Sequence, residues 1–145
     1  FPTIGIVYHP LEGFAYIGGS KLGAIKIDSS NDQKIISVSQ PTTPIRVVAS
    51  RSHLNDLTET FINSLGSVKT IQAGSSLKFC LIAEGVADIY PRLGPTSEWD
   101  TAAAQAVVEG AGGSVLTLER TRLHYQKENI LNPHFVVRGN NTLNS

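Results

Sequence analysis

The sequence predicts a layered α/β protein, and three observations lead to that prediction. From residue 45 onward, short apolar strands alternate with helical patterns, which is typical of a sheet covered by helices. Before residue 45, short runs of alternating apolar and polar residues are separated by turn residues, as in antiparallel strands. The 145 residues correspond to one compact unit with a sizeable core.

The first 44 residues are expected to form strands followed by a loop. Strands are expected at residues 3–9, 14–17 and 24–27. The first two flank Pro10-Leu11-Glu12-Gly13, whose turn chemistry predicts a β-hairpin. Residues 28–44 are polar, rich in Ser, Thr, Asn and Pro, and have a weak strand pattern at residues 35–38. We interpret them as a surface loop at the seam between residues 1–44 and a second subdomain at residues 45–145.

The strands of the second subdomain are expected to be short and mostly buried. They are predicted at residues 45–49, 68–72, 87–90, 115–118 and 135–138. The run Ile45-Arg46-Val47-Val48-Ala49 is nearly all apolar, which is typical of a strand covered on both faces. A loop at residues 91–97 follows the third of these strands, and two prolines and a glycine stiffen it.

Helices are expected between these strands. They are predicted at residues 56–65, 75–84 and 99–111. At the start of the first, Asp56-Leu57-Thr58-Glu59 resembles a capping box, and Gly66 provides its C-terminal cap. The third has the strongest pattern, because apolar residues recur at helical spacing from Trp99 onward until Gly112-Gly113 ends the helix.

The composition excludes several classes of protein. Twelve Lys and Arg residues balance 12 Asp and Glu residues, whereas a general nucleic-acid binder would need a basic excess. No apolar run approaches the roughly 18 residues that cross a bilayer. A single cysteine, Cys80, excludes a disulfide framework within the chain, and we interpret it as a small buried side chain. We therefore expect a cytoplasmic protein without a transmembrane segment and without a nucleic-acid partner. Peripheral attachment to the inner membrane is the alternative location.

Three segments with phosphate-binding chemistry follow predicted strands. Gly74-Ser75 opens a helix with a hydroxyl and unpaired backbone N–H groups, and Lys78 adds a charge one turn later. Arg92 lies in the stiff loop, and its guanidinium fork suits a phosphate. His53, at the end of Ser50-Arg51-Ser52-His53, can donate to a phosphate or stack on a base. For each segment, an ordinary surface or capping role is the alternative.

Acidic residues are candidates for a metal site. Asp100 lies in the first turn of the third predicted helix, where the helix dipole favours a carboxylate that could bind a hard cation. The alternative is that Asp100 only complements the dipole. Glu84 and Asp88 flank a glycine and are interpreted as turn or surface acids. Because the candidate segments all follow strands, one edge of a layered sheet would bring them together, which favours a phosphate ligand.

Several motifs resemble those of a known enzyme family. Glu98-Trp99-Asp100-Thr101-Ala102-Ala103, followed one helix later by Ala111-Gly112-Gly113, resembles the signature of the inositol monophosphatase family of metal-dependent phosphatases. Other segments resemble the CysQ-type branch of 3′(2′),5′-bisphosphate nucleotidases: Ser50-Arg51-Ser52-His53, Leu77-Lys78-Phe79-Cys80, Ala87-Asp88-Ile89-Tyr90-Pro91-Arg92 and Leu131-Asn132-Pro133-His134-Phe135. The resemblance covers nearly the whole chain. It implies the layered sugar-phosphatase sandwich, in which residues 1–27 complete an antiparallel sheet of the upstream half.

The resemblance also implies roles for individual residues. Asp100 matches the metal-binding aspartate of the Trp-Asp motif and lies at the substrate. His53, Ser75, Lys78 and Arg92 match positions that hold the nucleotide and its phosphates in this branch. The implied activity is the magnesium-dependent removal of the 3′-phosphate from adenosine 3′,5′-bisphosphate, a small-molecule nucleotide.

The chain departs from the family pattern in its carboxylates. Family members have further metal ligands in a glutamate-rich motif and an Asp-Pro-x-Asp-Gly-Thr-type motif, and the chain contains neither. A site for two or three Mg²⁺ ions needs a cluster of carboxylates, so we expect the catalytic residues in a missing N-terminal half and an inactive isolated chain. The absence of methionine and the start at Phe1 agree with a downstream piece. An inositol- or sugar-phosphate phosphatase and a non-catalytic nucleotide- or phosphate-binding domain remain alternatives.

Overall fold

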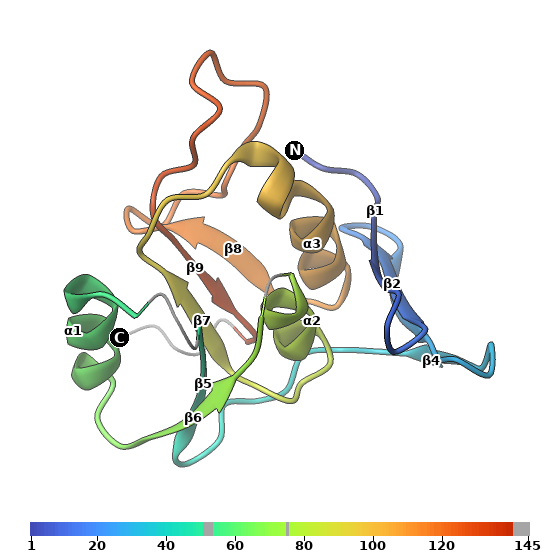
Figure 1. Ribbon diagram of the computed structural model, residues 1–145, viewed down its shortest axis with the longest axis horizontal. Helices are drawn as coiled ribbons and strands as arrows, with labels where there is room; N and C mark the ends of the chain where they lie inside the picture. Colours follow the sequence, from blue (N-terminus) through green and yellow to red (C-terminus); the bar gives the residue numbers. More distant parts are fainter. Residues whose placement is uncertain (51–53, 75, 141–145) are drawn as a thin grey trace.

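The computed structural model describes residues 1–50, 54–74 and 76–140, and it confirms the layered α/β fold (Figure 1). One sheet is antiparallel and contains β1 (Gly5–His9), β2 (Phe14–Gly19), β3 (Gly23–Ile27) and β4 (Gln33–Ile35) in that order. The second sheet contains β5 (Ile45–Ala49), β6 (Val68–Gln72), β7 (Ile89–Arg92), β8 (Ser114–Thr117) and β9 (Phe135–Arg138), in the order β6-β5-β7-β9-β8. The helices are α1 (Asp56–Ser64), α2 (Leu77–Ala83) and α3 (Glu98–Gly110).

The helices cover the five-stranded sheet on both faces. Helices α2 and α3 lie between the two sheets, and α1 lies on the far side of the five-stranded sheet (Figure 1). Phe61 and Ile62 of α1 pack against Val47 of β5, whereas the neighbouring Val48 belongs to the core between the sheets. This two-sided burial explains why β5 is nearly all apolar. None of the helices in the described ranges is long and apolar enough to cross a membrane.

The antiparallel sheet packs closely on α3 through small residues. A Cβ built on Gly5 would lie 2.0 Å from the backbone oxygen of Ala103, and one built on Gly18 would lie 2.9 Å from the Cα of Val107. Neither distance is sterically possible, so glycine is required at both positions. The close approach fixes β1 beside the first half of α3, where the candidate site is found.

The other face of the antiparallel sheet is apolar and exposed. The strand register places four isoleucines side by side: Ile6, Ile17, Ile25 and Ile35, here called the isoleucine row. Ile6 is 61% exposed and Ile35 is 83% exposed. Figure 1 shows the three described helices on the opposite side of this sheet. The isoleucine row is therefore an uncovered apolar surface within the part of the chain that the structure describes.

Asp88 is buried, so its interpretation as a turn or surface acid is wrong. Its carboxylate accepts hydrogen bonds from the side chain and backbone of Arg46 (2.8–3.2 Å), from Thr42 (2.7 Å) and from Ser39 (3.2 Å). These bonds tie the polar segment before β5 to the sheet. Burial alone would raise the pKa of Asp88, but the hydrogen bonds and charge of Arg46, with Thr42, lower it to about 2.

The low pKa of Asp88 predicts a specific loss of stability in acid. The folded protein holds this carboxylate ionised down to about pH 2, whereas in the unfolded chain its pKa is near 3.8, the ordinary value of an aspartate. The lowered pKa stabilises the folded protein by about 2 kcal/mol. This stabilisation is complete above the pKa of the unfolded chain and is lost as the pH falls toward 2. Chemical unfolding between pH 5 and pH 2 measures it. The Asp88→Asn variant should have a lower free energy of unfolding than wild type at neutral pH, and this free energy should fall less between pH 5 and pH 2. A pH dependence equal to that of wild type would refute the assignment.

Some predicted elements are shifted in the structure. Strand β7 begins at Ile89 and continues through Pro91 to Arg92, because β9 pairs with it along its whole length. Pro91 is tolerated since β5 pairs with β7 only at Ile89, so no bond to β5 is lost at the proline. Helix α1 is capped by Asn55, which accepts from the backbone of Thr58 (2.9 Å), instead of by the predicted capping box.

Other predicted elements differ in their ends or their burial. The weak strand expected at residues 35–38 is found at β4, and the helix expected from residue 75 begins at Leu77. Trp99 does not join the core as its helical spacing suggested, because it is 70% exposed in the first turn of α3. Side chains from before and after Ile45 share one core cluster, and the division at that residue into two subdomains stays a prediction.

Candidate functional site

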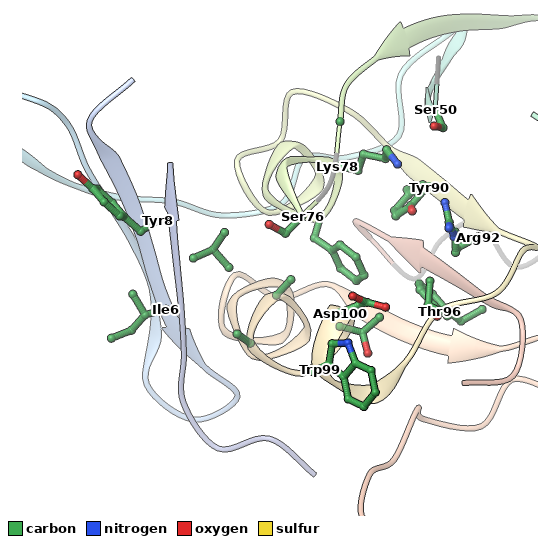
Figure 2. A pocket seen from close by; sticks show the side chains of 17 residues that line it. Ile6, Tyr8, Ser50, Ser76, Lys78, Tyr90, Arg92, Thr96, Trp99 and Asp100 are labelled. Atoms are coloured by element: carbon green, nitrogen blue, oxygen red, sulfur yellow. The ribbon is translucent and has the colours of Figure 1, made fainter. Parts of the chain in front are cut away.

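A cavity of about 650 Å³ opens where β1, the start of α2, the end of β7 and the start of α3 meet (Figure 2). The structure brings Lys78, Arg92 and Asp100 together around this cavity, although they come from separate segments. Ser50, at the end of β5, also lines it. His53 and Ser75 lie outside the described residues, and all of the predicted substrate-binding roles stay predictions.

Lys78 is a buried cation at the edge of the cavity. It is 4% exposed, and its Nζ lies 5.4 Å from the centre of the Tyr90 ring. Burial, together with the nearby charge of Arg92, lowers the pKa of Lys78. No ion pair involves Lys78 within the described ranges. A lysine in such a place gains a great deal from an anionic ligand.

Arg92 lies beside Lys78 at the end of β7. Its Nη2 donates to the backbone oxygen of Pro95 (3.2 Å), and its buried Nε has no hydrogen-bond partner in the described chain. Lys78 and Arg92 have no carboxylate partner among the described residues, so the two cations repel each other, and an oxyanion between them would remove that repulsion. In Figure 2 the side chains of Lys78 and Arg92 lie on the same side of the cavity.

Asp100 faces the cavity from the first turn of α3. Its Oδ2 accepts a hydrogen bond from the backbone N–H of Ser97 (2.8 Å), which satisfies one of the free N–H groups at the helix start. Its other oxygen has no hydrogen-bond partner among the described residues. Asp100 is therefore both a helix cap and a carboxylate with one oxygen available to a ligand.

The described residues do not make a complete metal site. No group of three or more His, Cys, Asp and Glu side chains that could hold a metal ion is found among them. The free oxygen of Asp100 suits a hard cation, because Mg²⁺ is often bound by one or two carboxylates together with water and substrate phosphates. The structure thus provides one fitting ligand atom, and the expectation of further ligands elsewhere stays a prediction.

Tyr90 also lines the cavity, although the sequence did not predict a role for it. It is 4% exposed, contacts Phe79 and Phe135 edge to face, and supports Lys78 with its ring. Burial raises the pKa of its hydroxyl. Alternation along β7 was the available signal, because Tyr90 and Arg92 are two residues apart and line the same cavity. Cys80 is fully buried as expected, and burial raises its pKa to about 12.

A second cavity adjoins the first across Arg92. It has a volume of about 470 Å³ and shares Ser50, Tyr90 and Arg92 with the first cavity. Its remaining lining comes from the start of α1 and the loop after β7 and includes Leu54, Pro91, Leu93 and Pro95. A polar, cationic cavity thus borders a more apolar one, an arrangement that suits a ligand with an anionic part and an apolar part.

Two sheets with α2 and α3 between them, and two cations and a carboxylate around a cavity at strand ends, define the class of α/β fold to which the chain belongs. The sequence profile of the inositol monophosphatase family matches residues 1–143, and the chain belongs to that family. This confirms the resemblance found in the sequence.

Individual relatives agree with the CysQ-type branch. The 3′(2′),5′-bisphosphate nucleotidase CysQ of Salmonella typhimurium is 42% identical over 137 residues, which are 94% of this chain and 54% of that protein. The crystal structure of CysQ from Bacteroides thetaiotaomicron, a bacterial member of the inositol monophosphatase family, superposes with a TM-score of 0.87 and 37% identity over 95% of this chain and 58% of that one. An inositol monophosphatase from Zymomonas mobilis shares the fold with a TM-score of 0.77 at 20% identity, covering 97% of this chain and 54% of that one. The chain spans about half the length of the relatives it matches.

Proposed function

We propose that the complete protein is a cytoplasmic, magnesium-dependent nucleotidase that removes the 3′-phosphate of adenosine 3′,5′-bisphosphate. The observation that supports it most is the pair of neighbouring cations, the buried Lys78 and the half-buried Arg92, which line one cavity with the Asp100 carboxylate and have no carboxylate partner among the described residues. The identity of 42% with a protein named 3′(2′),5′-bisphosphate nucleotidase points to the same substrate class.

The residues of this chain have separate parts in the proposed reaction. Lys78 and Arg92 bind phosphate oxygens, and their charges offset the negative charge of a substrate with two phosphates. Asp100 offers its free oxygen to Mg²⁺, which supplies activation of the attacking water and stabilisation of the phosphoryl charge when it is bound. Water adds its oxygen to the phosphorus, the bond from phosphorus to the 3′-oxygen breaks, and that oxygen leaves as a hydroxyl with a proton from solvent.

The proposal includes an upstream part of the protein. The described residues offer one carboxylate, Asp100, to the cavity, and the isoleucine row is uncovered on the outer face of the antiparallel sheet. A segment that packs on the isoleucine row and brings carboxylates to the rim of the cavity would meet both needs. The shares of 54% and 58% of the relatives' lengths leave room for such a segment.

Arg92→Ala is expected to raise KM for adenosine 3′,5′-bisphosphate more than KM for a nucleoside monophosphate. A charge-assisted, forked contact is worth about 1.5–3 kcal/mol, so KM for the bisphosphate should rise at least about tenfold. Steady-state kinetics on both substrates measures the difference. The control is Lys69→Ala, which removes an exposed cation of β6 outside the cavity. Equal effects of Arg92→Ala on the two substrates would place Arg92 outside the contacts to the second phosphate.

A further inference from the structure

The segment before β9 runs antiparallel along the start of α3. Glu98 donates its backbone N–H to the oxygen of Ile130 (2.9 Å), and Asn132 donates its own to the oxygen of Thr96 (2.9 Å). The start of α3 is thus held in place by a stretch of chain more than 30 residues later. Asn132 belongs to the segment Leu131-Asn132-Pro133-His134-Phe135, which resembles the CysQ-type branch.

The side chain of Asn132 adds further bonds to the same turn. It is 8% exposed, and its Nδ2 lies 3.0 Å from the backbone oxygen of Ser97, 3.0 Å from the Thr101 hydroxyl and 3.1 Å from the Thr96 hydroxyl. Its Oδ1 is buried and has no hydrogen-bond partner in the described chain. The contacts of Nδ2 alone therefore set the orientation of the amide.

These bonds reach the Asp100 carboxylate through one peptide group. The oxygen of the peptide between Thr96 and Ser97 accepts from the backbone of Asn132, and the N–H of that peptide donates to Oδ2 of Asp100 (2.8 Å). The next oxygen, that of Ser97, accepts both the side chain of Asn132 and the backbone N–H of Asp100 (2.9 Å). Asn132 and Asp100 thus bond the same two peptide groups from opposite sides.

We propose that Asn132 is a positioning residue that sets the orientation of the Asp100 carboxylate, a role that rests on the proposed function. With the turn fixed, one carboxylate oxygen stays on the N–H of Ser97 and the other stays directed at the cavity. Without the side chain of Asn132, the turn loses bonds to three oxygens and the carboxylate can leave its capping position. Active-site groups tolerate little such displacement, because small misplacements of a ligand cost large factors in rate.

Asn132→Ala in the complete enzyme is the test, with Tyr125→Phe as the matched control. The Tyr125 hydroxyl bonds Gln105 (2.6 Å) and Thr101 (2.9 Å), so its removal also disrupts buried hydrogen bonds on α3 but leaves the peptide groups that hold Asp100 untouched. We expect Asn132→Ala to lower kcat about tenfold or more with KM within about threefold, and to weaken Mg²⁺ binding measured by calorimetry by a similar factor. Tyr125→Phe should stay within about twofold of wild type in both measurements.

A double-mutant cycle separates positioning from general destabilisation. In an Asp100→Asn background, Asn132→Ala should cause no further loss of kcat, because the group that it positions is already gone. The positioning role would be overturned if Asn132→Ala lowered kcat by the same factor in the wild-type and Asp100→Asn backgrounds. It would also be overturned if Tyr125→Phe lowered kcat as much as Asn132→Ala does. Thermal unfolding checks each variant, and Asn132→Ser, which retains one short donor, replaces the alanine variant if that one does not fold. A wild-type enzyme that releases no phosphate refutes the proposed function itself, whereas an active wild type, an impaired Asp100→Asn and an unimpaired Asn132→Ala refute only the role of Asn132.

Discussion

Asp100→Asn is expected to lower kcat of the complete enzyme by about 100-fold or more while the protein stays folded. The asparagine oxygen can still accept the N–H of Ser97, as Oδ2 of Asp100 does at 2.8 Å, so the helix cap survives. The group then directed at the cavity is an NH₂, which is a donor and binds no cation. Turnover at saturating Mg²⁺, together with a thermal unfolding curve, measures both halves of the prediction.

The matched control for Asp100→Asn is Glu98→Gln. Glu98 lies in the same turn of α3, but its carboxylate pairs with Lys127 (2.7 Å) and does not line the cavity. Its replacement removes the same charge from the same helix end, and turnover should stay within about twofold of wild type. Near-normal turnover of Asp100→Asn would mean that the metal is bound elsewhere. Equal losses of turnover in Asp100→Asn and Glu98→Gln would mean that the negative charge at the start of α3 matters and that Asp100 does not act as a metal ligand.

The isolated 145-residue chain is expected to release no phosphate and to self-associate. The first expectation follows because Asp100 is the one carboxylate that the described residues present to the cavity. The second follows from the isoleucine row, since full burial of an isoleucine is worth about 1.5–3 kcal/mol and each of these side chains gains by packing on another surface. Size-exclusion chromatography with light scattering measures association, and an assay of released phosphate measures activity.

Variants of the isoleucine row test whether the isolated chain self-associates through this surface. Ile6→Ser combined with Ile35→Ser should shift the isolated chain toward monomer, because both side chains are largely exposed. Leu57→Ser, on the exposed side of α1, removes an apolar side chain elsewhere and should leave association unchanged. Co-expression of the proposed upstream part should restore both a monodisperse protein in size-exclusion chromatography and magnesium-dependent phosphate release. A monodisperse, active chain of 145 residues would show that all of the metal ligands lie within it.

The elements that the sequence predicted most accurately are those with a local cause. Strands β5, β6 and β9 begin and end where predicted, because short apolar runs bounded by turn residues need no distant partner to be recognised. The grouping of Lys78, Arg92 and Asp100 around one cavity agrees with the same logic, since residues after neighbouring strands meet at one edge of a sheet.

What the sequence could not predict depends on distant partners. Asp88 is buried because Arg46 neutralises it, and these residues are 42 positions apart. Asn132 acts on a turn more than 30 residues earlier, so its spacing gives no indication of the contact. Trp99 has the spacing of a core residue, but it lies in the first turn of α3, where it lines the cavity and is 70% exposed. Periodicity within a helix does not reveal which of its turns are covered by the rest of the protein.

The most direct test of the proposed function is the identity of the product. Adenosine 3′,5′-bisphosphate is incubated with the complete enzyme and Mg²⁺, and phosphorus NMR follows which ester is cleaved. The account predicts inorganic phosphate and adenosine 5′-monophosphate in equal amounts, with no reaction when Mg²⁺ is chelated. Release of the 5′-phosphate, or binding of the nucleotide without any cleavage, would contradict it.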